Sequence, residues 1–492
     1  MNWKVERTTK NVLVVSFGFL LLFTAFGGLQ SIQSSLNSDQ GLGLASLSVI
    51  YAALILSSMF LPPVMIKYLG CKWTIVISMC CYVAFSIGNF YPSWYTLIPT
   101  AIILGTGGAP LWSAKCAYLT ICGYQYAKKF NKIGENIVNH YFGIFFLVFQ
   151  SSAVWGNLLS SLIFQYSSGK ANITDEILAY CGPNNCPQYD EKVSQNVTSV
   201  HHSIAVIHTL SAIYTGVGVG GVLLVAFFLD QLDKKEIEDF KGKDVNIWAV
   251  LVATFTHLRD KRQCLLIVMT MYSGFEQGFL AGDYTKAYVT CTIGIQFVGY
   301  VMICFGASNS IFSVTFGKLS KYTGRIPLFA FATITNLASI IALFLWNPRP
   351  EQMPVFFVFP SLWGMADAIW QTQTNALYGV LFLSDKEAAF ANYRLWESVG
   401  FVTAFAYANF LCIKVKLIIL VIVLLLGMIM YGIVEYIEFV QHGSESPHTV
   451  SQILRGEHLK TKKQKPDELE EEAKEETETT DVKSVDENDA ET

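Results

Sequence analysis

Long apolar runs are the feature of this 492-residue chain that most limits its fold. Each run covers roughly twenty residues, the length that an α-helix with a rise of about 1.5 Å per residue needs to cross a bilayer core. Only 15% of the residues are charged, whereas soluble domains average about 25%. No succession of short alternating strands points to a β-barrel. The sequence therefore predicts an all-α polytopic membrane protein.

Twelve runs have the length of membrane-spanning helices. They cover residues 11–30, 43–66, 74–90, 95–119, 140–166, 203–229, 264–282, 292–316, 327–346, 355–380, 398–413 and 416–440. We expect twelve transmembrane helices in two six-helix halves. The divisions are an N-terminal half at 1–229, a cytoplasmic central loop at 230–263, a C-terminal half at 264–440 and a cytoplasmic tail at 441–492.

The distribution of Lys and Arg predicts the orientation. Loops after the even-numbered runs carry basic residues such as Lys67, Lys234 and Lys321, and the loops after the first and third runs carry none. Because positively charged loops stay in the cytoplasm, both termini are expected to be cytoplasmic. Two glycosylation acceptors, Asn172 and Asn196, lie in the loop that this orientation places outside.

The same outer loop contains the stretch "CGPNNC", which begins at Cys181 and ends at Cys186. This short spacing, with Gly and Pro inside it, predicts a small local disulfide loop in an oxidising compartment. No pair of cysteines has zinc-ligand spacing with a histidine nearby, so we expect neither a metal nor a cofactor.

The tail is strongly acidic. Residues 466–492 contain thirteen Asp and Glu but only two Lys. Such a segment buries too little apolar surface to offset its ordering entropy, so we expect it to be disordered. Its residues favour a solvating spacer over a docking or sorting segment.

The two halves contain related stretches. "PVMIKYLGCK" at 63–72 parallels "GKLSKYTGRI" at 317–326, and the surroundings of Trp112 parallel those of Trp370. Related six-helix halves with a central loop are typical of transporter folds.

Four stretches carry a resemblance to a known family: "YSGFEQGFLAGDYTKAYV", "FTAFGGLQSIQSSLN", "GAPLWSAKCAYLT" and "GFVTAFAY". With them the chain resembles the major facilitator-type fold and, within it, the unc-93 family. The resemblance implies a two-lobed membrane protein without catalytic activity. It also implies regulation of another membrane protein, plausibly a potassium channel, or transport of an unknown solute.

One stretch departs from the major facilitator pattern. The loop between the second and third helices usually reads G-x-x-x-D-R-x-G-R-R, with alternating charges that make contacts during rocking. Here Lys67 and Lys321 stand at the acidic position of the two halves. The loss of this charge contact argues against active alternating access.

Charged residues occur inside the apolar runs. Glu276 is predicted near mid-membrane, and Asp283 and Lys286 at the outer mouth, where they are expected to form a solvated pair. Asp367 and Gln371 form a polar stripe on one face of the tenth helix. In the fold that the chain resembles, the seventh and tenth helices line a central cavity, which would bring Glu276 and Asp367 together.

Two hypotheses fit these two acids. They could bind a proton or cation and couple it to a solute, or they could fix helix packing through hydrogen bonds. Lys115 lies nearer the cytoplasmic end and is expected to extend toward it.

Motifs for catalysis or nucleotide binding are absent from the sequence, so we expect no enzyme and no nucleic-acid partner. The expected partners are membrane lipid, a potassium channel or other membrane protein, and a small solute. The expected location is the plasma membrane.

Overall fold

The computed structural model describes residues 6–37, 41–132, 134–167, 178–189, 204–232, 256–382 and 386–442. Asn172, Asn196, most of the expected central loop and the acidic tail lie outside these ranges. The long helices are α1 (Arg7–Leu36), α2 (Leu42–Gly88), α3 (Trp94–Phe130), α4 (Gly134–Ser167), α7 (Ile204–Phe228), α10 (Lys261–Gly278), α12 (Val298–Thr323), α13 (Ile326–Leu345), α14 (Met353–Leu381), α15 (Lys386–Tyr407) and α16 (Ile413–His442). A π-helix, η4 (Phe279–Thr290), and the short α11 (Cys291–Ile293) continue α10. Short 3-10 turns are η2 (Gly182–Asn184), η3 (Pro187–Tyr189), η5 (Ile295–Phe297) and η6 (Pro350–Gln352).

Eleven helical segments within the described residues are long and apolar enough to cross a membrane. α2 supplies two of them, Leu42–Pro62 and Val64–Gly88. Its helical conformation breaks at Gly70, which has a φ of 74°. α15 adds a further segment of 22 residues, about 33 Å long at 1.5 Å per residue. The prediction of an all-α polytopic fold is thus confirmed, with a count of about twelve spans.

The eleventh predicted helix was placed too late. Residues 398–413 were expected, but α15 runs over Lys386–Tyr407. Charged residues such as Arg394 and Glu397 lower the hydropathy of its first half. Glu397 bonds to Ser273 of α10 and Gln371 of α14, so tertiary packing outweighs the local composition there.

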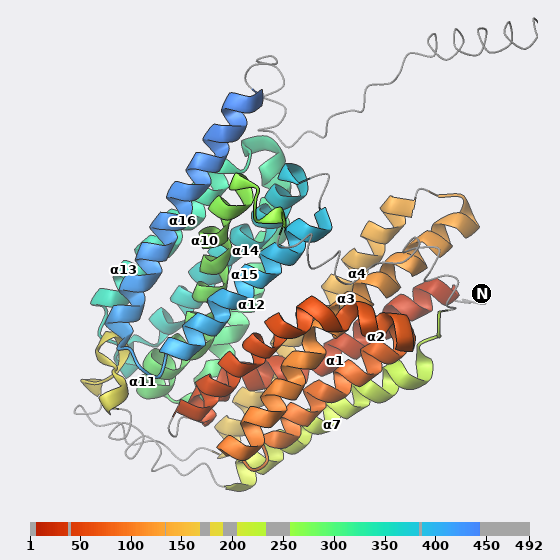
Figure 1. Ribbon diagram of the computed structural model, residues 1–492. Helices are drawn as coiled ribbons and strands as arrows, with labels where there is room; N and C mark the ends of the chain where they lie inside the picture. The colour runs from red at the N-terminus through yellow and green to blue at the C-terminus, as the bar shows by residue number, and fades with distance from the viewer. Residues whose placement is uncertain are drawn as a thin grey trace, which may run out of the picture.

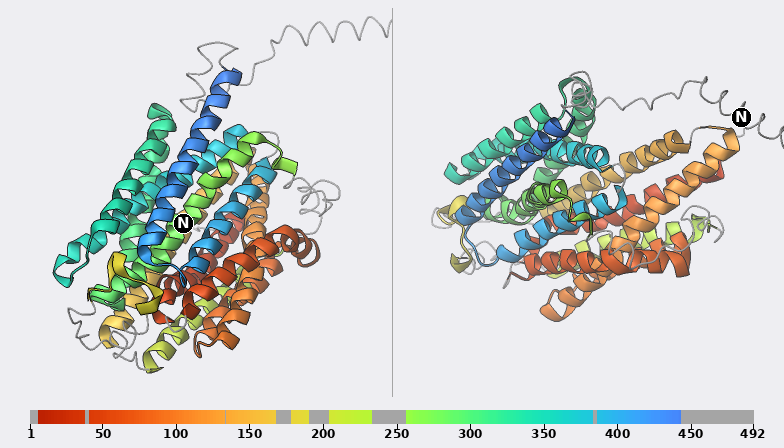
Figure 2. Two further views of the ribbon diagram at one scale, coloured as in Figure 1. Left: turned by 60° about the vertical axis from the view of Figure 1, so that its left-hand side comes forward. Right: turned by 45° about the horizontal axis from the view of Figure 1, so that its top comes forward.

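The helices form two bundles. Figure 1 shows α1, α2, α3, α4 and α7 on one side and α10 with α12 to α16 on the other, and the right-hand view of Figure 2 shows the same grouping. Each bundle has its own hydrophobic core. The turns after the second and eighth helices match, since Gly70 and Gly324 have similar φ values of 74° and 78°. Positive φ favours glycine, which explains why both related stretches keep it.

The bundles join at one end, which we call the outer end because it carries residues 178–189 and the charge rule predicts it to face outside. There Ile32 of α1 and Leu210 of α7 belong to the core of the second bundle, and Phe405 of α15 belongs to the core of the first. Tyr51 and Phe401 stack across the junction with ring centroids 4.4 Å apart.

Hydrogen bonds join the bundles at the same end. Ser34 and Ser35 of α1 contact Thr285 and Thr290 of the π-helix at 3.3 and 2.8 Å. At the opposite, inner end, the beginning of α1 and the end of α16 lie well apart (Figure 1). The outer end therefore holds the interface between the bundles.

Candidate functional site

Glu276 is the most deeply buried acid of the second bundle. It lies on α10 with 0% exposure. The side-chain amide of Asn336, on α13, donates to Glu276 Oε2 and also to the Tyr272 hydroxyl at 2.8 Å. A charge at this depth is costly unless it is hydrogen-bonded or paired, and Asn336 supplies such a bond.

Asp367 lies next to Glu276. It is 2% exposed on α14, and the side-chain amide of Asn309, on α12, donates to its Oδ2. The two carboxyl groups are close enough to interact directly with each other. Glu276 Oε1 and Asp367 Oδ1 have no hydrogen-bond partner of ordinary geometry among the described residues. The structure therefore brings the two acids together, enclosed by four helices of the second bundle.

Gln371 connects this pair to a third acid. Its side-chain amide donates to Glu397 Oε1 and to Ser273 Oγ, both at 3.0 Å. Arg394 donates to the other oxygen of Glu397 at 2.6 Å, and the two side chains are 61% and 7% exposed. A chain of polar contacts thus runs from the buried pair to an exposed guanidinium on α15.

Glycines bring α15 close enough for these contacts. A Cβ atom at Gly274 would collide with the carbonyl oxygen of Glu397, and one at Gly400 would collide with that of Met271. Because neither residue has a side chain, α10 and α15 pack backbone to backbone. This packing sets Ser273 of α10 beside Glu397 of α15, at 3.2 Å.

The predicted solvation of Asp283 is wrong, because this side chain is buried. Asp283 is 3% exposed, and Lys416 donates to its Oδ1 at 2.6 Å. Lys416 also donates to the carbonyl oxygen of Ala408 at 2.8 Å. Lys286 lies one turn further along the π-helix and is partly buried. The π-helix and the beginning of α16 together enclose Asp283. Because α16 is distant in the sequence, the residues around Asp283 do not predict this burial.

Lys115 does not extend toward the inner end as expected. It is 1% exposed, and its Nζ lies 4.4 Å from the ring centroid of Phe145 and 4.8 Å from that of Trp112. Phe142 and Phe146 complete the enclosure. Cation–π attraction to these rings of α3 and α4 compensates part of the desolvation of the ammonium group.

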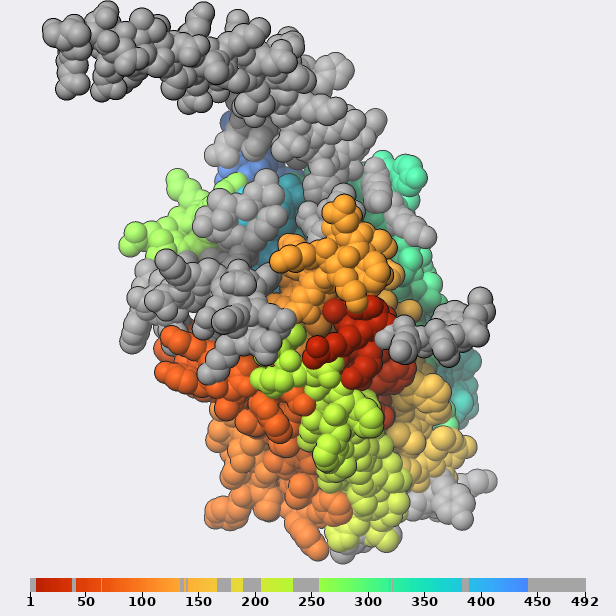
Figure 3. Space-filling model, turned by 90° about the vertical axis from the view of Figure 1, so that its right-hand side faces the viewer, coloured from red at the N-terminus to blue at the C-terminus, as the bar shows by residue number. Residues whose placement is uncertain are grey.

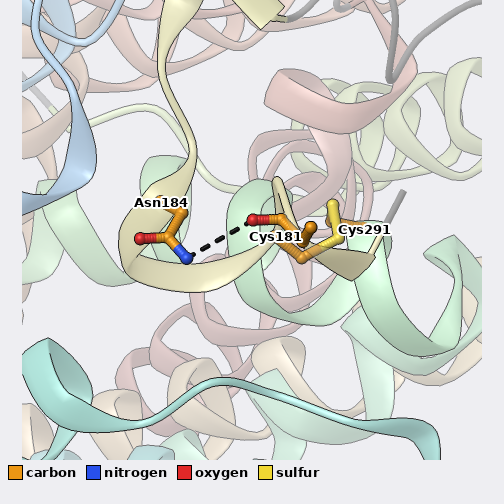
Figure 4. Close-up of a disulfide and its surroundings, with 4 residues drawn as sticks. Cys181, Asn184 and Cys291 are labelled. Carbon is orange, nitrogen blue, oxygen red and sulfur yellow. Dashed lines mark hydrogen bonds between the residues drawn. A yellow bond between two sulfur atoms is a disulfide. The ribbon is translucent and has the colours of Figure 1, made fainter. Parts of the chain in front are cut away.

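The predicted Cys181–Cys186 disulfide is also wrong. Cys181 is bonded to Cys291 and Cys186 to Cys412, across 110 and 226 residues. Figure 4 shows the first bond beside Asn184, whose side-chain amide donates to the carbonyl oxygen of Ala179 at 3.3 Å. The segment lies on the second bundle, where Cys291 and Cys412 are its disulfide partners.

At the inner end, one ion pair occupies the region of the degenerate charge motif. Arg325, just after Gly324, donates two hydrogen bonds to Glu435 of α16, at 2.6 and 2.9 Å. Burial lowers the pKa of Arg325, but its bonds and charge pairing with Glu435 outweigh this and raise the pKa above its ordinary value. Tyr68 and Tyr322, at matching positions of the two halves, are 74% and 83% exposed.

Several site residues were missed from the sequence. They are Asn309, Asn336, Glu397, Lys416, Cys291 and Cys412. Asparagines inside the apolar runs were a usable signal, because polar side chains in membrane helices tend to face one another. Glu397 was not recognised as a helical residue, because the predicted eleventh helix begins at residue 398.

Comparison with known proteins gives a consistent result. The model of a family described as "Ion channel regulatory protein UNC-93" matches residues 35–431. "Protein unc-93 homolog A" of Xenopus laevis is 62% identical over 449 residues, 91% of this chain and 97% of the relative. "Putative potassium channel regulatory protein unc-93" of Caenorhabditis elegans is 35% identical over 436 residues, 86% of this chain and 61% of that protein.

Two solved structures share the fold. The nucleoside transporter NupG aligns with a TM-score of 0.58 and 12% identity, over 85% of this chain and 98% of its own. A peptide transporter, POT in complex with sulfate, aligns with a TM-score of 0.57 and 12% identity. The alignment covers 87% of this chain and 95% of the transporter chain. At this identity the likeness concerns the fold alone, which is of the major facilitator type.

Proposed function

This chain belongs to the UNC-93 family, and we propose that it is a non-catalytic regulator of another membrane protein, with a potassium channel as the partner. The description of the family and the name of the nematode relative support this proposal. The partner would bind through the bilayer, where long membrane helices offer their lipid-facing sides.

The inner loop after the second helix supports the same proposal. Lys67 and Tyr68 are exposed there, at positions where the major facilitator pattern has an acid and an arginine. Without that acid, the loop lacks the charge contact that would stabilise a rocking transporter. A protein that keeps the fold but loses this contact fits a binding scaffold.

A second function is favoured by the buried acids. Glu276 and Asp367 adjoin each other among four helices, and intramembrane acids in such places often bind the ion that drives a transporter. We therefore keep a proton- or cation-coupled solute transporter of unknown substrate as the alternative.

The location follows from the same proposal. A regulator of a plasma-membrane channel would itself be in the plasma membrane, with lipid around it and both termini in the cytoplasm. Glycans on Asn172 and Asn196 would then face outside. Both asparagines lie outside the described residues.

One experiment separates the two functions. Whole-cell currents of a two-pore-type potassium channel are recorded with and without this chain, and solute uptake is screened in cells that express this chain alone. The wild type is compared with a Glu276→Gln, Asp367→Asn variant, and with Glu351→Gln as a surface-acid control. Surface biotinylation first establishes equal delivery.

A regulator changes the channel current and produces no uptake of its own. A transporter produces an uptake that depends on pH or on a cation, and the double variant loses it while Glu351→Gln keeps it. A chain that leaves the channel current unchanged and shows such uptake would overturn the regulator proposal.

A further inference from the structure

Residues 178–189, which we call the strap, belong to the chain between α4 and α7 of the first bundle but pack on the second. Asn185 accepts a hydrogen bond on its carbonyl oxygen from the Ile413 backbone N–H at 3.0 Å. Gly182 has a φ of 67°, and a Cβ atom there would contact Pro348 and Tyr288. The strap is thus fitted closely onto the outer ends of three elements of the second bundle.

Two disulfides fix the strap in this place. Cys181 is bonded to Cys291, the first residue after the π-helix, and Cys186 to Cys412, the residue before α16. Only five positions separate the two strap cysteines. The strap therefore links the outer end of the π-helix covalently to the beginning of α16, as Figure 4 shows for the first bond.

The buried ion pair fastens the same two elements. Asp283 lies in the π-helix and Lys416 near the beginning of α16, with 2.6 Å between their charged atoms. The π-helix is in turn the element of the second bundle that hydrogen-bonds to α1, through Thr285 and Thr290. π-helical turns are rare and frequently occur at functional sites. Here one is held at its outer end.

We propose that the strap is a redox-sensitive lock on the outer end of the protein. With both disulfides formed, the π-helix cannot bend away from α16, and it stays against Ser34 and Ser35 of α1. Reduction of both bonds, with two electrons and two protons taken up by each from a dithiol reductant, frees the π-helix to part from α1. The locked protein opens only at its inner end, and this holds for a regulator and for a transporter alike.

Thiol labelling at the junction tests the lock. Ser34 is 1% exposed and contacts Thr285 at 3.3 Å, so Ser34→Cys reports whether α1 and the π-helix have parted. Intact cells are treated briefly with a dithiol reductant, washed, and labelled with a membrane-impermeant maleimide. Mass spectrometry then quantifies the label at residue 34 itself, which keeps the freed strap thiols out of the measurement.

Reduction should speed labelling at residue 34 by about thirtyfold or more, the change that corresponds to the lower end of a disulfide's typical contribution. A variant in which Cys181, Cys186, Cys291 and Cys412 are all serine should show the same rate without reductant. Ser78→Cys, at a fully buried position of the first core, is the control for unfolding and should stay unlabelled.

Two results would overturn the lock. One is an unchanged slow rate at residue 34 after mass spectrometry has shown that both strap disulfides are reduced. The other is equal acceleration at residues 34 and 78 on reduction, because the strap would then hold the whole fold rather than the outer junction.

Discussion

Lys416 of α16 and Asp283 of the π-helix form an ion pair of 2.6 Å in which both side chains are at most 4% exposed. Lys416 also bonds to the carbonyl oxygen of Ala408, so its ammonium group has two acceptors. This pair joins the elements that the strap also joins. It is therefore a second, non-covalent fastening of the outer end.

Removing one partner of this pair should destabilise the protein strongly. Lys416→Met breaks the buried ion pair with Asp283 by removing one partner, a change that typically costs about 3–5 kcal/mol. The expected result is a clearly lower apparent melting temperature in detergent. The double variant Asp283→Met, Lys416→Met removes both charges and should recover most of the loss.

The surface pair of Glu6 and Lys129 is the control. Its Nζ–Oε1 distance is also 2.6 Å, but the lysine side chain is 61% exposed. Lys129→Met should therefore cost less than about 1 kcal/mol. Equal losses for the two lysine variants would contradict the importance of burial at Lys416.

The disulfide pairing predicts a simple gel pattern. A site-specific protease sequence inserted between residues 190 and 200 separates Cys181 and Cys186 from Cys291 and Cys412. After thiol blocking, denaturation and cleavage, the two fragments should stay joined without reductant and separate with it. Cys186→Ala should still leave them joined through the Cys181–Cys291 bond.

A local Cys181–Cys186 bond would release the fragments without reductant. Cys181→Ser, Cys186→Ser removes both interfragment bonds and gives the reference pattern for separated fragments. Cys264→Ser, which removes a free cysteine, should leave the wild-type pattern unchanged.

Local composition predicted the positions of the helices well, but it predicted the contacts of individual side chains poorly. Membrane spans depend on the apolarity of about twenty neighbouring residues, which the sequence displays directly. The partners of Cys181 and Cys186 are 110 and 226 residues away, and no local pattern encodes them. The role of Lys416, at the beginning of the predicted run 416–440, was missed for the same reason.

Glu276 and Asp367 illustrate what a pattern reveals about a buried site. Their depth and helix faces could be estimated by counting residues, and the shared fold then suggested that they meet. Asn336 and Asn309, which bond to them, lie on α13 and α12. Their rotation toward the acids depends on packing between helices, which the sequence does not state.

Replacing the Asn336 side chain should lower the stability of the protein. Asn336→Leu removes the amide that donates to Glu276 and Tyr272, and an unpaired buried acceptor costs about 1–3 kcal/mol, or more when charged. The apparent melting temperature should fall. Adding Glu276→Leu should restore part of it, because the orphaned carboxyl group is then gone.

The neighbouring Thr335 gives the matched control on the same helix. Among the described residues, its hydroxyl bonds only to the Phe331 carbonyl oxygen of its own helix. Thr335→Val should therefore change stability by no more than about 0.5 kcal/mol. A loss as large as that of Asn336→Leu would point to disturbed α13 packing instead of a lost bond to Glu276.

The ion pair of Asp230 and Arg7 joins the end of α7 to the beginning of α1. Its contribution to stability should depend on pH. Figure 3 shows these two segments side by side at the inner end, and Arg7 donates to Asp230 at 2.8 Å. Burial raises the pKa of Asp230, but the hydrogen bond from Arg7 and the charges of Lys10 and Arg7 outweigh it. Together they hold the pKa below its ordinary value.

A carboxyl group with a depressed folded-state pKa stabilises the fold above its unfolded pKa of about 3.9 and loses this contribution as the pH falls through the folded value. The melting-temperature difference between wild type and Asp230→Asn should therefore be constant from pH 7 to 5 and shrink below about pH 4. Arg7 is 73% exposed, so the difference at pH 7 corresponds to no more than about 1 kcal/mol. A difference that grows on acidification would contradict the lowered pKa of Asp230. A difference that stays unchanged below pH 4 would mean that the asparagine disturbs the backbone contacts of residue 230 with Tyr118 and Asn11.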